Sequence, residues 1–292
     1  MTREIKNIIN IIVFLICIAL VNVAGQNIEL EIRGINAFTF VLIVAVLIQV
    51  IFFIPSYLLK TEKYYDLVGS LTYVTTISLA YFSVENKTSI DTIIYLYVMV
   101  WATRLGIYLF RRVQKDGKDV RFEKAKTHFF WFLQYWMGQA LWVSLTSCAA
   151  IIAILSPEEN SLPILAILGM ALWLTGFTIE SISDYQKRVF RKENNPSQSF
   201  IHTGLWARSR HPNYFGEITL WTGIAVIALN TLSGVEFITL ISPVFVYILL
   251  TRMSGINLLE RIADERYGEL EEYQRYKRNT PVLFPKLSKN KN

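Results

Sequence analysis

The sequence predicts an all-α, polytopic integral membrane protein: one membrane domain of about eight helical spans, with seven as the alternative, and both termini in the cytoplasm. Of its 292 residues, 53% are hydrophobic, and the mean hydropathy is +0.36. The apolar residues come in blocks of about twenty, the length that a helix needs to cross a bilayer. The expected spans cover residues 8–24, 36–59, 67–84, 90–110, 129–155, 163–191, 213–229 and 235–251.

The first four spans follow from apolar runs and their flanks. Residues 8–24 end at Ala24, in a small-residue site that a signal peptidase could cleave, but we expect a retained helix, so that residues 1–35 form an extra N-terminal span and loop. The second span contains Pro55 near its end, and the third is shorter and more polar. The fourth carries Arg104, and a lone cation there costs about 2.5–3.5 kcal/mol, so a buried partner or a polar cavity is expected.

The last four spans lead to a charged tail. The fifth is rich in aromatic residues and contains Gln139. The sixth has no helix breaker through Glu180 and Asp184, so its last turns are expected to project from the bilayer. The seventh and eighth are short and are joined by a tight turn at Asn230–Gly234. The tail segment Asn257–Tyr276 is helical in pattern.

The distribution of Lys and Arg sets the orientation and accounts for the net charge of +6. With the N-terminus inside, the outer segments contain only Arg33 and Lys87, whereas the basic clusters, including 111–126 and 187–210, all fall on the cytoplasmic face. This topology explains the cations without a nucleic acid, which we do not expect as a partner.

Cysteine and histidine do not form a recognisable metal site. The two cysteines, Cys17 and Cys148, lie inside apolar runs, so neither a disulfide framework nor a thiolate site is expected. The histidines His128, His202 and His211 are scattered without ligand spacing. We therefore expect no metal.

The segment that contains the most chemistry is GLWARSRHPNYFGE, residues 204–217. Pro212 suits the first turn of a helix, and Arg208, Arg210 and His211 precede it, so an anion could meet the helix N-terminus and the guanidinium groups together. The polar residues of the opening turns are Asn213, Tyr214 and Glu217. The alternative is a positive loop beside the membrane, followed by a capped helix.

A second group lies on the sixth span. Glu180, Asp184, Arg188 and Arg191 are spaced by four, four and three residues, so they share one face of a helix. They either form ion pairs on the helix surface or bind a nucleotide, with an acid on a ribose or amide and the arginines on phosphates.

A third group lies in the tail, where Glu260, Arg261 and Tyr267 belong to a helix with two interpretations. It either lies on the membrane surface as an amphipathic helix, or it folds over the nucleotide as a cap, with an aromatic ring on the base and an arginine on a phosphate.

A fourth group lies in the N-terminal half. Asp66, Tyr65 and Arg104 are polar residues at or near membrane depth and could form the proton-donor side of a reaction. A structural ion pair between Asp66 and Arg104 is the competing interpretation.

Three motifs together resemble a known family. GLWARSRHPNYFGE, preceded by ESISDYQKRVF at Glu180–Phe190 and followed by SGINLLE at Ser254–Glu260, is similar to the DUF1295 family of the steroid 5-alpha-reductase C-terminal-domain superfamily. The resemblance covers about residues 40–285. It implies a multi-helix membrane fold in which NADPH enters from the cytoplasmic side. It also implies reduction of a carbon–carbon double bond conjugated to a carbonyl, in a steroid-like or isoprenoid-like substrate taken from the bilayer.

The resemblance also assigns residues to the cofactor. Asp184, Arg191, Asn213 and Glu217 match polar cofactor-binding positions of the reductases, and Arg210 and Tyr214 match the family signature. With the neighbouring groups, the expected cofactor-binding set is Glu180, Asp184, Arg188, Arg191, Arg208, Arg210, His211, Asn213, Tyr214, Glu217, Glu260, Arg261 and Tyr267.

The chain departs from the steroid reductases where their carbonyl-polarising acid lies. They carry Gln–Glu just before Pro–Ser in an early helix, whereas Phe52–Ser56 reads FFIPS. Asp66 or the adjacent Tyr65 is our expected substitute, with Arg104 beside them.

A second relative offers another function. The isoprenylcysteine carboxyl methyltransferases share an arginine–histidine–proline signature and a tail of the form E…G…Y…Y, which Glu260, Gly268, Tyr273 and Tyr276 fit. The Gly-Leu-Trp sequence at 204–206 favours the reductase. The alternatives are therefore an S-adenosylmethionine-dependent methyltransferase and a non-enzymatic lipid-binding membrane protein. The abundant Ile, Lys and Asn favour a bacterial inner membrane over the endoplasmic reticulum.

Overall fold

The computed structural model describes residues 2–116, 119, 121–156, 164–194, 199–253 and 255–286. The chain forms two compact units, which are described separately. The first unit comprises Met1–Ala166 and Ala225–Ser242, and the second comprises Ile167–Ile224 and Pro243–Asn292.

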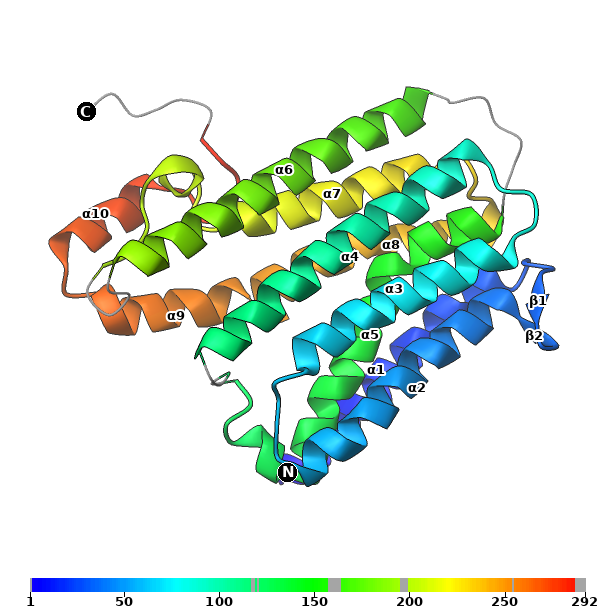
Figure 1. The fold of residues 1–292 in the computed structure, drawn as a ribbon, viewed down its shortest axis with the longest axis horizontal. Coiled ribbons are helices and arrows are strands. Elements are labelled where there is room, and N and C mark those ends of the chain that lie inside the picture. The colour runs from blue at the N-terminus through cyan, green and yellow to red at the C-terminus, as the bar shows by residue number, and fades with distance from the viewer. Residues whose placement is uncertain are drawn as a thin grey trace. The chain divides into compact units, whose positions relative to one another are not determined.

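The first unit is a bundle of five long helices (Figure 1). They are α1 (Arg3–Asn22), α2 (Ala37–Leu58), α3 (Tyr65–Ser83), α4 (Ser89–Asp116) and α5 (Phe129–Leu155). A small hairpin of β1 (Glu31–Ile32) and β2 (Ile35–Asn36) joins α1 to α2. It turns at Arg33 and Gly34, which both have positive φ, and the sequence did not predict it.

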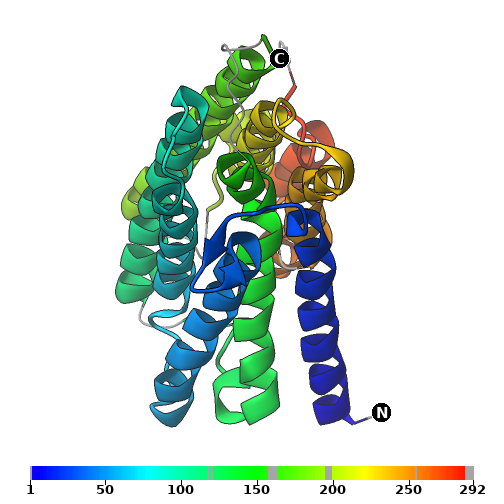
Figure 2. The ribbon, with the colours of Figure 1, turned by 90° about the vertical axis from the view of Figure 1, so that its right-hand side faces the viewer.

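Helix α5 is the central element of this unit. It packs against α1, α2, α3 and α4, and Figure 2 shows it between α1 and α2. In its most apolar stretch, 89% of the residues are buried, compared with 22% in α1 and 39% in α2. The polar residues in this stretch of α5 are therefore enclosed by protein and can interact with groups inside the bundle.

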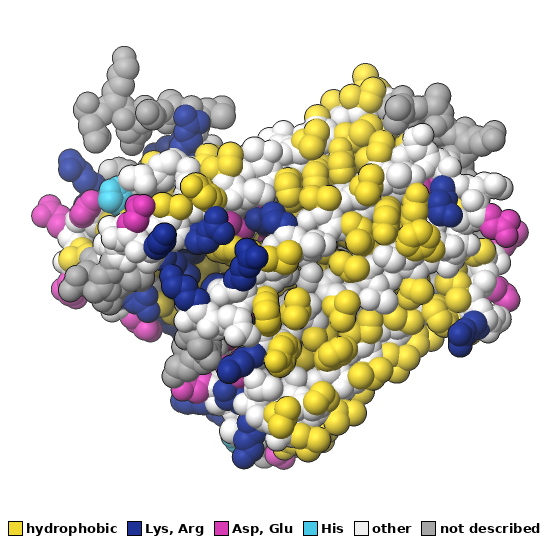
Figure 3. All heavy atoms as spheres, viewed as in Figure 1, with side chains coloured by type: hydrophobic (Ala, Val, Ile, Leu, Met, Phe, Trp, Pro, Cys, Tyr) yellow, Lys and Arg dark blue, Asp and Glu magenta, His cyan; other side chains and the backbone are white. Residues whose placement is uncertain are grey.

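Helix α2 has its apolar surface on the outside as well as the inside. Ile43, Leu47, Ile51 and Leu58 are 43–71% exposed and lie on one face, whereas the buried residues of the opposite face include Gln49. On the face seen in Figure 3, hydrophobic side chains cover much of the surface over this bundle. Such an exterior suits lipid, because an apolar face of this size is costly in water.

Six helical stretches among the described residues are long and apolar enough to cross a membrane. They correspond to the expected spans one, two, four, five, six and eight, so the prediction of an all-α membrane bundle is confirmed. Helices α3 and α7 (Pro212–Ala228) form where spans three and seven were expected, but they are not among the six. α7 has 17 residues. The number of spans and the location of the termini stay predictions.

The second unit contains α6 (Ile164–Glu193) and α7, followed by α8 (Ile241–Ile248), a π-helical turn, α9 (Ile256–Tyr267) and α10 (Glu271–Asn279). One end of each of the helices α6, α7 and α8 belongs to the first unit. Helices α6 and α7 run side by side (Figure 1). A Cβ atom on Gly216 would lie 2.6 Å from the carbonyl oxygen of Gly176, and one on Gly223 would lie 2.6 Å from that of Gly169. Glycine therefore allows the two backbones to touch.

Two helices end at different places from those expected. The fourth expected span stopped at residue 110, but α4 continues to Asp116, into the basic segment. The tail was expected to be one helix, but it is broken between the end of α9 at Tyr267 and the start of α10 at Glu271. The break begins at Gly268, whose low helix propensity favours an end there.

We predict that Gly216→Ala destabilises the second unit by about 1–3 kcal/mol, because the added methyl group overlaps the backbone and side chain of Glu180 on α6. Thermal unfolding in detergent measures the effect. Gly138→Ala is the matched control, since its Cβ would make a much looser contact, at 3.4 Å, with Phe14. Equal stability of both variants would contradict the close helix contact.

Candidate functional site

The basic motif is held by the C-terminal tail within the second unit. α7 begins at Pro212, as predicted, and the two residues before it share one carboxylate. Arg210 Nη1 donates to Glu260 Oε2 at 2.5 Å, and His211 Nε2 lies 2.9 Å from Glu260 Oε1. Lys277 Nζ is 3.9 Å from Oε2 of the same residue. The tail thus supplies the counter-charge for the motif.

Backbone contacts fix the same loop. The Arg210 N–H donates to the Pro281 carbonyl at 2.9 Å, and the Lys286 N–H donates to the Arg208 carbonyl at 3.0 Å. Tyr276 donates its hydroxyl to the Trp206 carbonyl at 2.7 Å. These bonds make the tail a cap on the motif. That the tail also covers a nucleotide stays a prediction.

The tail tyrosines pack together instead of presenting free rings. Phe200 lies 5.7 Å from Tyr267 and 5.2 Å from Tyr273, measured between ring centroids. Tyr267 is 8% exposed, whereas Arg261 projects outward and pairs with Glu265 at 3.9 Å. Glu260 therefore faces the basic motif, whereas Arg261 points away from it.

The four charged residues on one face of α6 differ in burial. Glu180 and Asp184 are 2% and 5% exposed, whereas Arg188 and Arg191 are not buried. The interpretation of all four as ion pairs on a helix surface therefore does not hold for the two acids. Close packing against Gly216 places Glu180 beside the start of α7, where Glu217 is 6% exposed.

The remaining motif residues surround the first turn of α7. The Tyr214 ring stacks on His211 with a centroid distance of 5.6 Å and an interplanar angle of 13°, and Asn213 is partly buried. Arg208 is exposed. Nε of Arg210 is buried and has no hydrogen-bond partner among the described residues, so one guanidinium donor is available for an acceptor.

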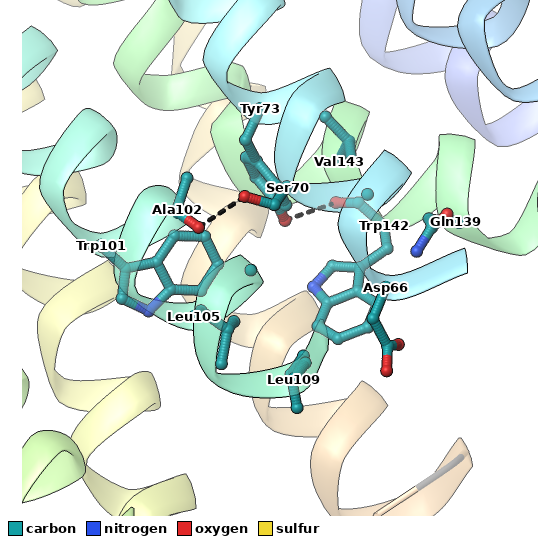
Figure 4. Close-up of a pocket in the computed structure, with 12 residues that line it drawn as sticks. Asp66, Ser70, Tyr73, Trp101, Ala102, Leu105, Leu109, Gln139, Trp142 and Val143 are labelled. Atoms are coloured by element: carbon teal, nitrogen blue, oxygen red, sulfur yellow. Dashed lines mark hydrogen bonds between the residues drawn. The ribbon is translucent and has the colours of Figure 1, made fainter. Parts of the chain in front are cut away.

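A separate pocket lies in the first unit, between α3, α4 and α5 (Figure 4). Its empty space is about 390 Å³, including the part open to the surroundings. The Trp101 and Trp142 rings lie on different sides, and Asp66 and Gln139 lie on the Trp142 side. The lining residues are Asp66, Gly69, Ser70, Tyr73, Trp101, Ala102, Leu105, Gly106, Leu109, Gln139, Trp142 and Val143.

The pocket contains polar atoms that the described residues do not satisfy. Gln139 Oε1 and Trp142 Nε1 are buried and have no hydrogen-bond partner there. Gly69 leaves room for the amide, since a Cβ at this position would overlap Gln139 Nε2. Buried polar groups without partners are costly, and a ligand with oxygen atoms could bind them.

Two arginines that no sequence motif singled out hold Asp66 in place. Its carboxylate lies 3.4 Å from Arg112 Nη2 and 3.5 Å from Arg121 Nη2. Arg121 also binds Asp119 at 2.6 Å. The Asp66 carboxylate oxygens therefore lie beside guanidinium groups, which can only donate hydrogen bonds.

The other two expected catalytic residues lie outside the pocket lining. Tyr65 is 7% exposed, and its hydroxyl donates to the Tyr135 carbonyl at 2.9 Å. Arg104 lies on α4 and is partly buried. Tyr73 lines the pocket instead, two turns after Tyr65 on α3. The structure therefore does not bring Tyr65 into the pocket with Asp66, because adjacent helical residues face different directions.

Apolar outer faces, six long apolar helices and a basic loop capped by the tail, all among the described residues, define the class: an all-α integral membrane protein. The chain belongs to the DUF1295 family, whose model, described as a protein of unknown function, matches residues 52–280. The resemblance inferred from the motifs is thereby confirmed.

Curated relatives match smaller parts of the chain. It is 31% identical over 119 residues to 3-oxo-5-alpha-steroid 4-dehydrogenase 1 of Mus musculus and 30% identical over 117 residues to that of Rattus norvegicus. These matches cover 41% and 40% of this chain and the same shares of the relatives. The match to the Homo sapiens protein is 37% identical over 71 residues, 24% of this chain and 27% of the relative. No solved structure matches the chain.

Acid should weaken the capped loop through His211. Burial lowers the pKa of His211 and outweighs the Glu260 carboxylate, which raises it. Below about pH 6.5 the unfolded chain then binds more protons than the folded one, so stability falls as the pH falls.

We predict that the thermal stability of wild type decreases more steeply than that of His211→Gln between about pH 7.5 and pH 5.5. His128→Gln, at an exposed histidine, should follow wild type. Identical pH profiles for wild type and His211→Gln would show that His211 does not cause the loss.

Proposed function

We propose that this protein is an NADPH-dependent reductase of a carbon–carbon double bond conjugated to a carbonyl in a lipid-like substrate. The similarity to 3-oxo-5-alpha-steroid 4-dehydrogenase 1 supports the class of the proposed enzyme, an oxidoreductase. NADPH supplies the hydride when bound. We further propose a bacterial inner membrane, with the cofactor residues on the cytoplasmic face.

The second unit has groups that fit the cofactor. Arg210 has an unused buried donor, and Arg188, Arg191 and Arg208 are accessible cations that could bind phosphate. The buried acids Glu180, Asp184 and Glu217 could accept hydrogen bonds from ribose hydroxyl groups and the nicotinamide amide, with Asn213 beside them. The arginines suit the anionic part of a ligand, and the buried acids suit a part of it that is rich in hydroxyl groups.

The pocket of the first unit has groups that fit an enone. Its two indole rings could flank a flat apolar skeleton. The Tyr73 hydroxyl donates to the Trp142 carbonyl at 3.5 Å (Figure 4), a long hydrogen bond that a substrate carbonyl oxygen could replace as negative charge develops there. This donation would stabilise the enolate that would form once the β-carbon has received the hydride, and a proton taken up from water at the α-carbon would complete the reduction. We propose that Asp66, held by Arg112 and Arg121, acts as an acceptor that orders this end of the pocket.

An S-adenosylmethionine-dependent methyltransferase is the second candidate. Glu260, Gly268, Tyr273 and Tyr276 fit the tail pattern of the isoprenylcysteine carboxyl methyltransferases. Glu260, Tyr273 and Tyr276 belong to the tail that caps the basic loop. The residues of this pattern therefore lie in the region that we propose binds the cofactor. A non-enzymatic lipid-binding protein would need neither ligand.

We predict that NADPH raises the thermal stability of the purified protein in detergent. A ligand that binds only the folded state at about 100 times its Kd adds about 2.7 kcal/mol. NADH should stabilise less, because it lacks the 2′-phosphate, and Arg210→Gln should weaken the NADPH effect.

S-adenosylmethionine serves as the competing ligand in the same assay. Stabilisation by S-adenosylmethionine and not by NADPH would replace the reductase with the methyltransferase. Stabilisation by neither, with retained binding of lipid, would support the non-enzymatic function.

We predict that Tyr73→Phe lowers kcat for enone reduction about 10²–10³-fold and leaves NADPH affinity unchanged, because it removes one donor to the developing oxyanion. NADPH oxidation with a 3-oxo-4-ene steroid is the first assay. Tyr65→Phe is the matched control, since the Tyr65 hydroxyl donates to the Tyr135 carbonyl at 2.9 Å away from the pocket lining, whereas the longer bond of the Tyr73 hydroxyl to Trp142 is made at the pocket. It should alter stability but not turnover, and a loss of kcat only in Tyr65→Phe would reverse the assignment.

A further inference from the structure

Glu260 connects the two residues that precede α7. Its side chain is 20% exposed, and those of its partners Arg210 and His211 are 11% and 7% exposed. We propose that Glu260 is a positioning residue, which does not contact the cofactor but holds Arg210 and His211 in the arrangement that binds the cofactor phosphate. This inference rests on the proposed function, because it takes NADPH as the ligand of the motif.

The hydrogen bonds of Glu260 leave its carboxylate without an unused oxygen. Oε2 accepts from Arg210, and Oε1 lies within hydrogen-bond distance of His211. Lys277 lies near Oε2 of Glu260. It also binds Asp264, which follows Glu260 by one turn of α9. A carboxylate engaged in this way is suited to fixing its neighbours, and it would also repel a phosphate group that approached it directly.

Arg210 is held along one edge and has donor capacity on another. A guanidinium group has five N–H donors in a planar fork, of which Nη1 donates to Glu260. Nε is buried and has no partner among the described residues. With the plane fixed by Glu260, this donor can meet a phosphoryl oxygen without first losing the freedom of a long side chain.

His211 is fixed in both orientation and tautomer. The carboxylate lies beside Nε2, so the neutral ring carries its proton there and has Nδ1 as an acceptor. The ring is also stacked on Tyr214 in the first turn of α7, and its backbone N–H donates to Ser209 Oγ at 3.1 Å. Without Glu260, the ring would lose the partner that determines which nitrogen is protonated.

A double-mutant cycle tests whether Glu260 acts through Arg210. NADPH dissociation constants are measured in detergent for wild type, Glu260→Gln, Arg210→Gln and the double variant. Glu260→Gln should weaken binding about tenfold, as expected for the loss of a hydrogen bond between charged groups. Added to Arg210→Gln, Glu260→Gln should cost less than it does alone, and added to the Arg210→Gln/His211→Gln variant it should cost at most about twofold, because the effect of Glu260 requires these two residues.

Two further variants serve as controls. Glu265→Gln removes a carboxylate from the same helix at a position whose side chain is 70% exposed, and it should bind NADPH like wild type. Glu260→Asp keeps the charge and should restore part of the affinity. A full additional loss from Glu260→Gln in the variant that already lacks Arg210 and His211 would show that Glu260 contacts the cofactor itself. Wild-type affinity in Glu260→Gln would remove its role.

Hydrogen exchange of residues 204–211 separates this inference from the proposed function. Glu260→Gln should increase exchange in this loop without any ligand, whereas Glu265→Gln should not. Unchanged exchange in Glu260→Gln would overturn the positioning role. Failure of NADPH to stabilise wild type would overturn the proposed cofactor instead, whatever the exchange result.

Discussion

The internal pairing of polar groups is the constraint on which both units depend. A charged side chain that is largely buried needs a partner within the protein, because burying an unpaired charge is costly. Asp66 meets Arg112 and Arg121 in the first unit, and Glu260 meets Arg210 and His211 in the second. In both cases, one carboxylate connects segments that are far apart in sequence.

Glycine makes such pairing possible where helices approach closely. Gly216 brings α7 against α6 and thereby places Glu180 beside the start of α7. In the first unit, Gly69 accommodates the amide of Gln139, and Gly106 faces Ser70. These glycines provide space where a methyl group would overlap with neighbouring atoms, so that buried polar side chains can be packed into an otherwise apolar bundle.

The two candidate sites differ in chemistry. The capped loop combines cations, buried acids and a helix N-terminus, which suits an anionic ligand with hydroxyl groups. The pocket of the first unit combines indole rings with a few polar atoms, which suits a flat apolar ligand with an oxygen function. A reductase of a lipid-like substrate needs one site of each kind, and this division gives the proposed function its structural support.

The sequence by itself determined the class, the family and most helices. Apolar blocks of bilayer length, the start of α7 at Pro212 and the three motifs can all be recognised locally. Only the tertiary structure decided that Glu260 faces Arg210, that Tyr73 and not Tyr65 lines the pocket, and that the charged face of α6 is buried at its acidic end. The physical reason is that periodicity defines the face of a helix on which a residue lies, whereas packing between distant segments determines what covers that face.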